Sequence, residues 1–126
     1  MVAINIEADG DVQILQNNYI QSFYADAGLN SLADSASTSA LTYSPPSGSS
    51  TAKVLVILGS ITTASLGTLT LTDGTDSYYI NAPSGTGSRR VEFDNIPNAL
   101  LASFSVTNGL GVALASSGNS LTIIPL

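Results

Sequence analysis

The stretch TLTLTDGTDSYYI, residues 68–80, decides how the fold is predicted. Leucine alternates with threonine before the first aspartate, and a tyrosine-rich run follows the second. Side chains on a strand point alternately to the two faces of a sheet, so this pattern predicts two half-buried strands. Between them, Asp73 to Asp76 predicts a hairpin loop in which Asp73 accepts backbone N–H groups and Gly74 takes a positive φ.

The two aspartates of this loop have two other interpretations. A calcium loop needs oxygen ligands at several alternate positions and a bidentate acid further along, but no acid follows Asp76 until Glu92. A glycosidase needs two carboxylates on either side of a sugar, one of them protonated. Two acids on one exposed turn both stay ionised. The sequence therefore favours a turn over a metal loop or a catalytic carboxylate pair.

Further strand patterns fill residues 51–126. The β-branched and leucine-rich run 53–58 predicts a strand buried on both faces. Val91 and Phe93 alternate with charged residues, which predicts a half-buried strand. About six or seven strands at about ten-residue spacing predict an all-β fold, an antiparallel β-sandwich or jelly roll, with at most one helical turn at 98–102.

The end of the chain has its own turn signals. Asn108-Gly109 predicts a turn, because both residues tolerate positive φ. Val112 and Leu114 then predict another strand, and Pro125 is expected to end the pairing of the last one.

The chain divides into three parts by composition. Residues 1–32 are expected to form an N-terminal arm or hairpin, because apolar residues flank Asp9-Gly10. Residues 33–50 are rich in serine and proline and predict a linker or a long surface loop. Residues 51–126 form the predicted sandwich core. Over residues 12–24, apolar residues every four positions fit a helix, whereas asparagines and aromatic residues favour a strand; both stay open, with a strand preferred.

The composition excludes several classes of partner. The chain is 44% hydrophobic but only 10% charged, and its longest clean apolar run, VLVIL at 54–58, is far shorter than a membrane span. Its net charge is −6, and its only cations are Lys53, Arg89 and Arg90. Three cations cannot supply a phosphate-binding groove, so nucleic acid is not an expected partner. The short apolar run likewise argues against a membrane as a partner. A surface with so few charged residues favours association with other proteins.

The chain carries little chemistry for catalysis. It has no cysteine and no histidine, and no serine lies in a G-x-S-x-G elbow. We therefore predict no enzyme, no cofactor and no metal. Arg89 and Arg90 are expected to form cross-strand or inter-subunit ion pairs in preference to a ligand clamp. Tyr78-Tyr79 has two interpretations, a sugar-stacking platform or one core and one outward tyrosine, and the second is favoured.

The motifs of residues 52–126 resemble a small β-sandwich module of tailed-bacteriophage virion proteins. The matching stretches are GTLTLTDG at 67–74, VEFD at 91–94, NGLGVAL at 108–114 and LTII at 121–124. The resemblance implies a structural subunit of the virion, foremost a capsid decoration (cement) protein, and it carries no functional residues over. The ending IIPL departs from the aromatic or charged close of that module.

The expected partners follow from this resemblance. A cement protein binds across neighbouring subunits of the major capsid protein, and a terminus that adds a strand to a neighbour is one way to do so. We expect dimers or trimers on the capsid surface, made in the host cytoplasm because the start lacks a secretory signal. The expected contact residues are Ile4, Ile6, Tyr19, Phe23, Tyr24 and Tyr43.

Three alternatives remain open from the sequence. A tail or fibre component would use the same kind of module elsewhere on the particle. A carbohydrate-binding sandwich for receptor recognition would use Tyr78, Tyr79 and nearby acids. A small hydrolase would use Asp73 and Asp76 as a pair.

Overall fold

The computed structural model describes residues 5–6, 12–13, 21–61, 67–82 and 87–126. The elements are mostly strands. Their bounds are β1 Asn5–Ile6, β2 Val12–Gln13, β3 Ser22–Tyr24, β4 Thr51–Ile61, β5 Thr68–Thr72, β6 Ser77–Asn81, β7 Gly87–Pro97, α1 Asn98–Leu101, β8 Ser105–Gly109 and β9 Ser120–Pro125.

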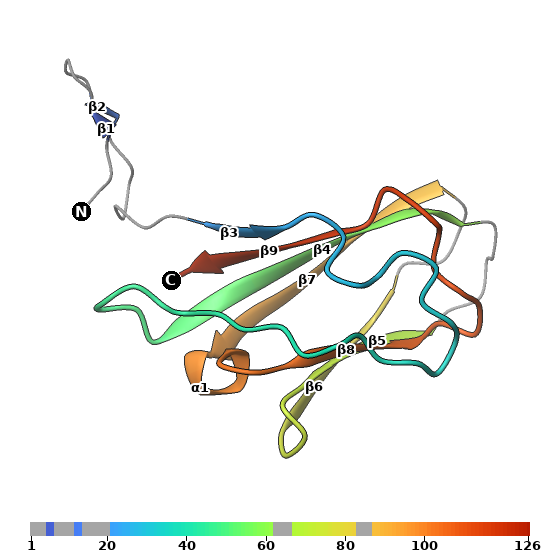
Figure 1. The fold of residues 1–126 in the computed structure, drawn as a ribbon. Helices are drawn as coiled ribbons and strands as arrows, with labels where there is room; N and C mark the ends of the chain where they lie inside the picture. Colours follow the sequence, from blue (N-terminus) through green and yellow to red (C-terminus); the bar gives the residue numbers. More distant parts are fainter. Residues whose placement is uncertain (1–4, 7–11, 14–20, 62–66, 83–86) are drawn as a thin grey trace.

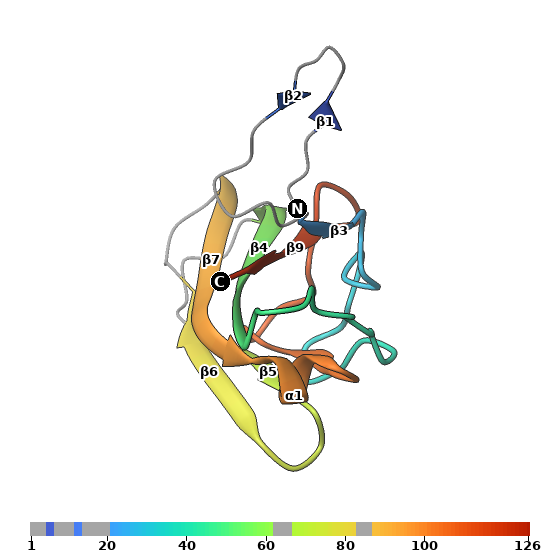
Figure 2. The same cartoon turned by 90° about the vertical axis from the view of Figure 1, so that its left-hand side faces the viewer.

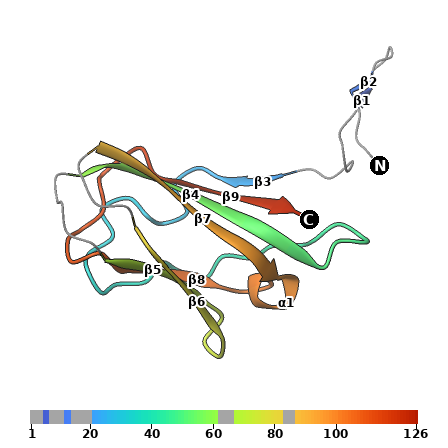
Figure 3. The ribbon, with the colours of Figure 1, turned by 180° about the vertical axis from the view of Figure 1, so that it is seen from behind.

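Two antiparallel sheets form the layers of a sandwich (Figures 1 and 3). One has the strand order β3-β9-β4-β7 and the other the order β6-β5-β8. The predicted all-β sandwich is therefore confirmed, and so is the single helical turn, α1. The predicted N-terminal hairpin pairs as β1 with β2, in a two-stranded sheet of its own.

The core lies between the two sheets, and the period of the sequence explains how. Leu69 and Leu71 on β5 and Val91 and Phe93 on β7 are buried, as the alternation predicts. The prediction that 53–58 is buried on both faces is wrong, because every second residue from Thr51 to Ile57 is only half-buried. That outer row faces away from the second sheet and is covered mainly by cross-strand neighbours from β7 and β9.

The end of the chain differs from the prediction in two ways. Residues 110–119 form a loop, so the strand predicted at Val112 and Leu114 is wrong, although Leu114 is buried. Pro125 does not end the pairing, because it lies opposite Ala52 and the next amide, that of Leu126, donates to the Thr51 carbonyl at 2.9 Å. Proline is tolerated there because N–H groups alternate sides along a strand, so the nitrogen of Pro125 faces away from β4, on the side where β3 pairs only with residues 121–123.

The Ser/Pro-rich segment packs onto the sandwich as a long loop. Thr38 N–H donates to the Val106 carbonyl at 2.9 Å, and Leu41 N–H donates to the Phe104 carbonyl at 2.7 Å. These bonds run along the outer edge of β8, which residues 35–41 thereby cover. Covering an edge strand in this way satisfies its backbone groups and blocks pairing with other chains.

Tyr43 belongs to this packed loop and corrects a prediction. It was expected to be a capsid contact residue, a role that requires an exposed side chain, but it is only 5% exposed. Its hydroxyl has no hydrogen-bond partner within the described residues, and burial raises the pKa of its phenol. Most of the loop is exposed, but Thr38 and Tyr43 are buried because the loop packs against the core at these points.

Replacing Tyr43 with phenylalanine is expected to leave stability unchanged or to raise it by about 1 kcal/mol. The change removes a buried hydroxyl without a partner and keeps the ring. Urea unfolding of both proteins measures the difference. Tyr24→Phe is the matched control, because the Tyr24 hydroxyl donates to the Thr42 carbonyl. That variant should lose about 0.5–1.5 kcal/mol; an equal loss in Tyr43→Phe would contradict the prediction.

Candidate binding groove between strands β6 and β7

The DGTD loop is a turn, as predicted. One carboxylate oxygen of Asp73 accepts the N–H of Thr75 at 2.8 Å and the N–H of Asp76 at 2.7 Å. Gly74 has a φ of 94°, which favours glycine. The backbone donors, Asp76 foremost, lower the pKa of the Asp73 carboxyl because they stabilise its charged form. The carboxylate is thus already used by the turn.

This hydrogen bonding gives a pH-dependent contribution to stability. The folded-state pKa of Asp73 is lowered, so its contribution is present above the unfolded pKa of about 4 and is lost as the pH falls through the folded value. In Asp73→Asn, we expect the free energy of unfolding to fall less between about pH 5 and pH 2 than in the wild type. Urea unfolding at several pH values measures this slope.

The control for this experiment is Asp76→Asn, which removes a charge from the same loop. Within the described residues, the Asp76 side chain accepts no hydrogen bond, so this variant should keep the wild-type slope. If the free energy of unfolding of Asp73→Asn changed with pH as steeply as that of the wild type, the hydrogen bonds of the turn would not be the cause of this pH dependence.

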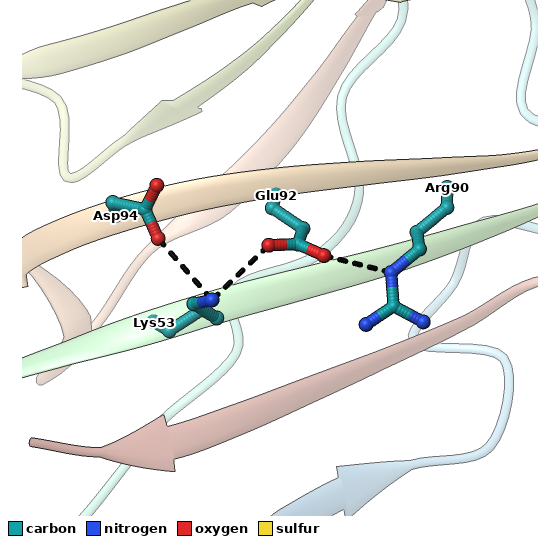
Figure 4. Close-up of polar contacts among 4 residues, drawn as sticks. All are labelled: Lys53, Arg90, Glu92 and Asp94. Atoms are coloured by element: carbon teal, nitrogen blue, oxygen red, sulfur yellow. Dashed lines mark hydrogen bonds and ion pairs between the residues drawn. The ribbon is translucent and has the colours of Figure 1, made fainter.

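A row of charged side chains crosses β4 and β7 on the outer face of the larger sheet (Figure 4). Lys53 Nζ lies 3.1 Å from Glu92 Oε1 and 3.6 Å from Asp94 Oδ1. Arg90 Nε lies 2.7 Å from Glu92 Oε2. Arg90 first and Lys53 second lower the pKa of the Glu92 carboxyl by donating to its charged form.

This row modifies the prediction made for the two arginines. The cross-strand ion pair exists, but Lys53 makes it, whereas Arg90 pairs with Glu92 along its own strand. Arg89 is buried, because the alternation of β7 turns it to the opposite face from Arg90. One oxygen of Glu92 faces each cation, so its carboxylate is held in a fixed orientation.

A groove of about 210 Å³ lies between β6 and β7. The two strands belong to different sheets and run side by side along one flank of the sandwich (Figure 2). The lining residues come from both strands and are Tyr78, Tyr79 and Ile80 of β6 with Glu92, Phe93, Asp94 and Ile96 of β7.

The groove combines an apolar floor with an aromatic and acidic rim. Phe93 and Ile96 are buried beneath it, whereas Tyr78 is 38% exposed and Tyr79 70% exposed. The favoured interpretation of the tyrosines, with one of them in the core, is therefore wrong. Tyr78 does lie opposite Leu71, but β6 is the edge strand of its sheet, so its side chain borders the groove instead of the middle of the core.

A second cavity, of about 280 Å³, lies beside the DGTD turn. Hydroxyl side chains dominate its walls, and its aromatic residue, Phe104, is buried. Asp73 also borders this cavity, but its carboxylate already accepts two backbone hydrogen bonds of the turn. The β6–β7 groove is therefore the stronger candidate for a binding site.

The predicted contact residues do not gather in one place. Phe23 on β3 is 65% exposed, as a contact residue should be. Tyr24 is half-buried, with its hydroxyl bonded to the loop, and Tyr43 is in the core. Ile6 belongs to β1, while Ile4 and Tyr19 lie outside the described residues, as do residues 14–20 of the segment with two interpretations. Its end, Ser22–Tyr24, is a strand.

Within the described part of the chain, no three acidic side chains cluster so as to hold a metal ion. No helix in the same residues has the length and apolar character needed to cross a bilayer. No protein-family model, curated protein or solved structure matches the chain.

Proposed function

We propose that this protein is a structural subunit of a bacteriophage virion, a head decoration protein that binds across neighbouring major capsid subunits and stabilises the shell. The observation that supports the proposal is the resemblance of residues 52–126 to the virion sandwich module. A sandwich by itself hosts many functions, so the proposal rests on those motifs and not on the fold.

The edges of the sheets offer a physical mechanism. In the part of the chain that the structure describes, no further strand pairs with the outer edge of β3. That edge carries Phe23, one of the most exposed apolar side chains described. An open edge can add a strand from a neighbour, with main-chain hydrogen bonds giving affinity and a side chain giving specificity. The β3 edge is therefore the proposed capsid contact.

The first test is the mass of the purified protein by light scattering, followed by sedimentation with empty shells of its phage. We expect a dimer or trimer that sediments with the shells. A deletion that tests the N-terminal segment must stop at residue 20, because β3 pairs with β9 and because Leu29 and Tyr43 beyond it belong to the core. A monomer that stays in solution beside the shells would overturn the proposal.

The second test is a pair of exposed aromatic variants. Phe23→Ala should weaken shell binding by about tenfold, because an exposed aromatic anchor carries much of the energy of an interface. Tyr79→Ala removes an equally exposed ring from a strand of the other sheet and should bind shells as the wild type does. Equal loss in both variants, or loss in neither, would exclude the β3 edge as the contact.

A further inference from the structure

We propose that the β6–β7 groove is a carbohydrate-binding site that holds one ring of an uncharged hexopyranose. This inference goes beyond the capsid role and does not depend on it. It rests on four groups that two strands of different sheets bring together, namely Tyr78, Tyr79, Glu92 and Asp94.

The aromatic rim suits the apolar face of a sugar ring. A pyranose presents C–H groups on one face and hydroxyls around its edge. Tyr79 exposes 70% of its surface to water and Tyr78 38%, on the rim of a groove whose floor is apolar. Adjacent residues of a strand point to opposite faces, so we assign the stacking to the more exposed ring, Tyr79. Covering that ring with C–H groups removes apolar surface from water while its phenol hydroxyl stays hydrated.

The carboxylates suit the hydroxyl edge of the same ring. Glu92 is fixed by Lys53 on one oxygen and by Arg90 on the other, so it needs little ordering when a ligand binds. Asp94 has a side chain that is 64% exposed, and its contact with Lys53 is the longer one. Carboxylates are strong acceptors for hydroxyl donors. Preorganised polar groups on rigid strands lower the cost of binding.

The volume of the groove and the net charge of the chain restrict the class of ligand. At about 210 Å³, the groove is smaller than the roughly 300–1,000 Å³ of pockets for drug-sized ligands, which fits a single ring with the rest of the glycan in solvent. The net charge of the chain is −6, and its field works against an anionic sugar. An uncharged hexose or N-acetylhexosamine is therefore favoured over a sialic or uronic acid.

The experiment starts with a printed array of neutral, sialylated and uronic-acid glycans, probed with the labelled full chain. A bound glycan is then titrated against the protein with tyrosine fluorescence as the signal, because the chain has five tyrosines and no tryptophan. The variants are Tyr79→Ala, Tyr79→Phe and Asp94→Asn. The matched control is Phe23→Ala, which removes an exposed aromatic from the other sheet.

We expect the wild type to bind neutral glycans and Tyr79→Ala to bind them about tenfold more weakly. Asp94→Asn should weaken binding, whereas Tyr79→Phe and Phe23→Ala should bind as the wild type does. An array without binding overturns the inference, and so does binding only to anionic glycans. Binding that Tyr79→Ala and Asp94→Asn both leave unchanged places the sugar elsewhere and also overturns it. Because these side chains are exposed, their replacement should change stability little. Thermal unfolding of each variant checks that it is folded.

Discussion

Replacing Gly59 with alanine will lower the free energy of unfolding by about 3 kcal/mol or more. The added methyl group would overlap the carbonyl oxygen of Ser117 and lie within 2.9 Å of the Ala115 side chain. A backbone carbonyl cannot move aside as the end of a flexible side chain can. The Gly59 N–H also donates to the Asn119 side chain at 2.8 Å, so the strand cannot shift without breaking that bond.

Urea unfolding with a two-state fit measures this loss. Ser60→Ala is the control, because Ser60 is the next residue along β4 and is exposed. Surface substitutions of that kind change stability by less than about 0.5 kcal/mol. If Gly59→Ala were as stable as Ser60→Ala, the close approach of residues 115–117 to β4 would be wrong.

The second large effect is expected at Asn108, which is 0% exposed. Its side-chain N–H groups donate to the carbonyls of Leu32 and Val112, and its side-chain oxygen accepts the N–H of Leu110. Asn108→Leu keeps the branched shape of the side chain but leaves the Val112 carbonyl and the Leu110 N–H without this partner, whereas the Leu32 carbonyl still accepts the Leu114 N–H. Each such group costs about 1–3 kcal/mol, so we expect a loss of about 3 kcal/mol.

Thermal and urea unfolding of Asn108→Leu measure this loss. The same substitution at Asn81, which is exposed on β6, controls for exchanging an amide for an apolar side chain. It should change stability by less than about 0.5 kcal/mol. A stable Asn108→Leu protein would mean that the loops at residues 32 and 112 are held by other contacts.

Local patterns predicted the elements that depend on local physics. The alternation of β5 and β7 and the hydrogen bonding of Asp73 follow from side-chain direction and turn chemistry within a few residues. The misjudged burial of 53–58 has a long-range cause. A β-branched run is compatible with one covered face or with two, and only the order of the strands decides between them.

Asn108 illustrates the same limit. Asn108-Gly109 is a turn signal in sequence, yet both residues end strand β8. The amide of Asn108 instead joins a loop 76 residues away, at Leu32, to the loop that directly follows its own strand, at Val112. A buried asparagine of this kind has no local signature, because its partners are backbone groups that any residue supplies.

The groove was predicted in part. Tyr78 and Tyr79 were recognised as a possible sugar platform, and Glu92 and Asp94 as a charged strand face. The proximity of these tyrosines to these acids was not predicted, because it depends on β6 and β7, edge strands of different sheets, lying along one flank of the sandwich. The interpretation with one core tyrosine failed for the same reason, since the sequence does not tell which strand lies at an edge.

The loop of residues 35–41 has a consequence for how copies of this chain can polymerise. The smaller sheet has the order β6-β5-β8, and this loop occupies its β8 side. Within the residues that the structure describes, strand addition to that sheet is therefore possible only at the β6 side. A subunit with one usable side closes a pair and then stops, whereas one with two usable sides can propagate into a fibre. By blocking strand addition at β8, the loop of residues 35–41 prevents this sheet from extending into a fibre.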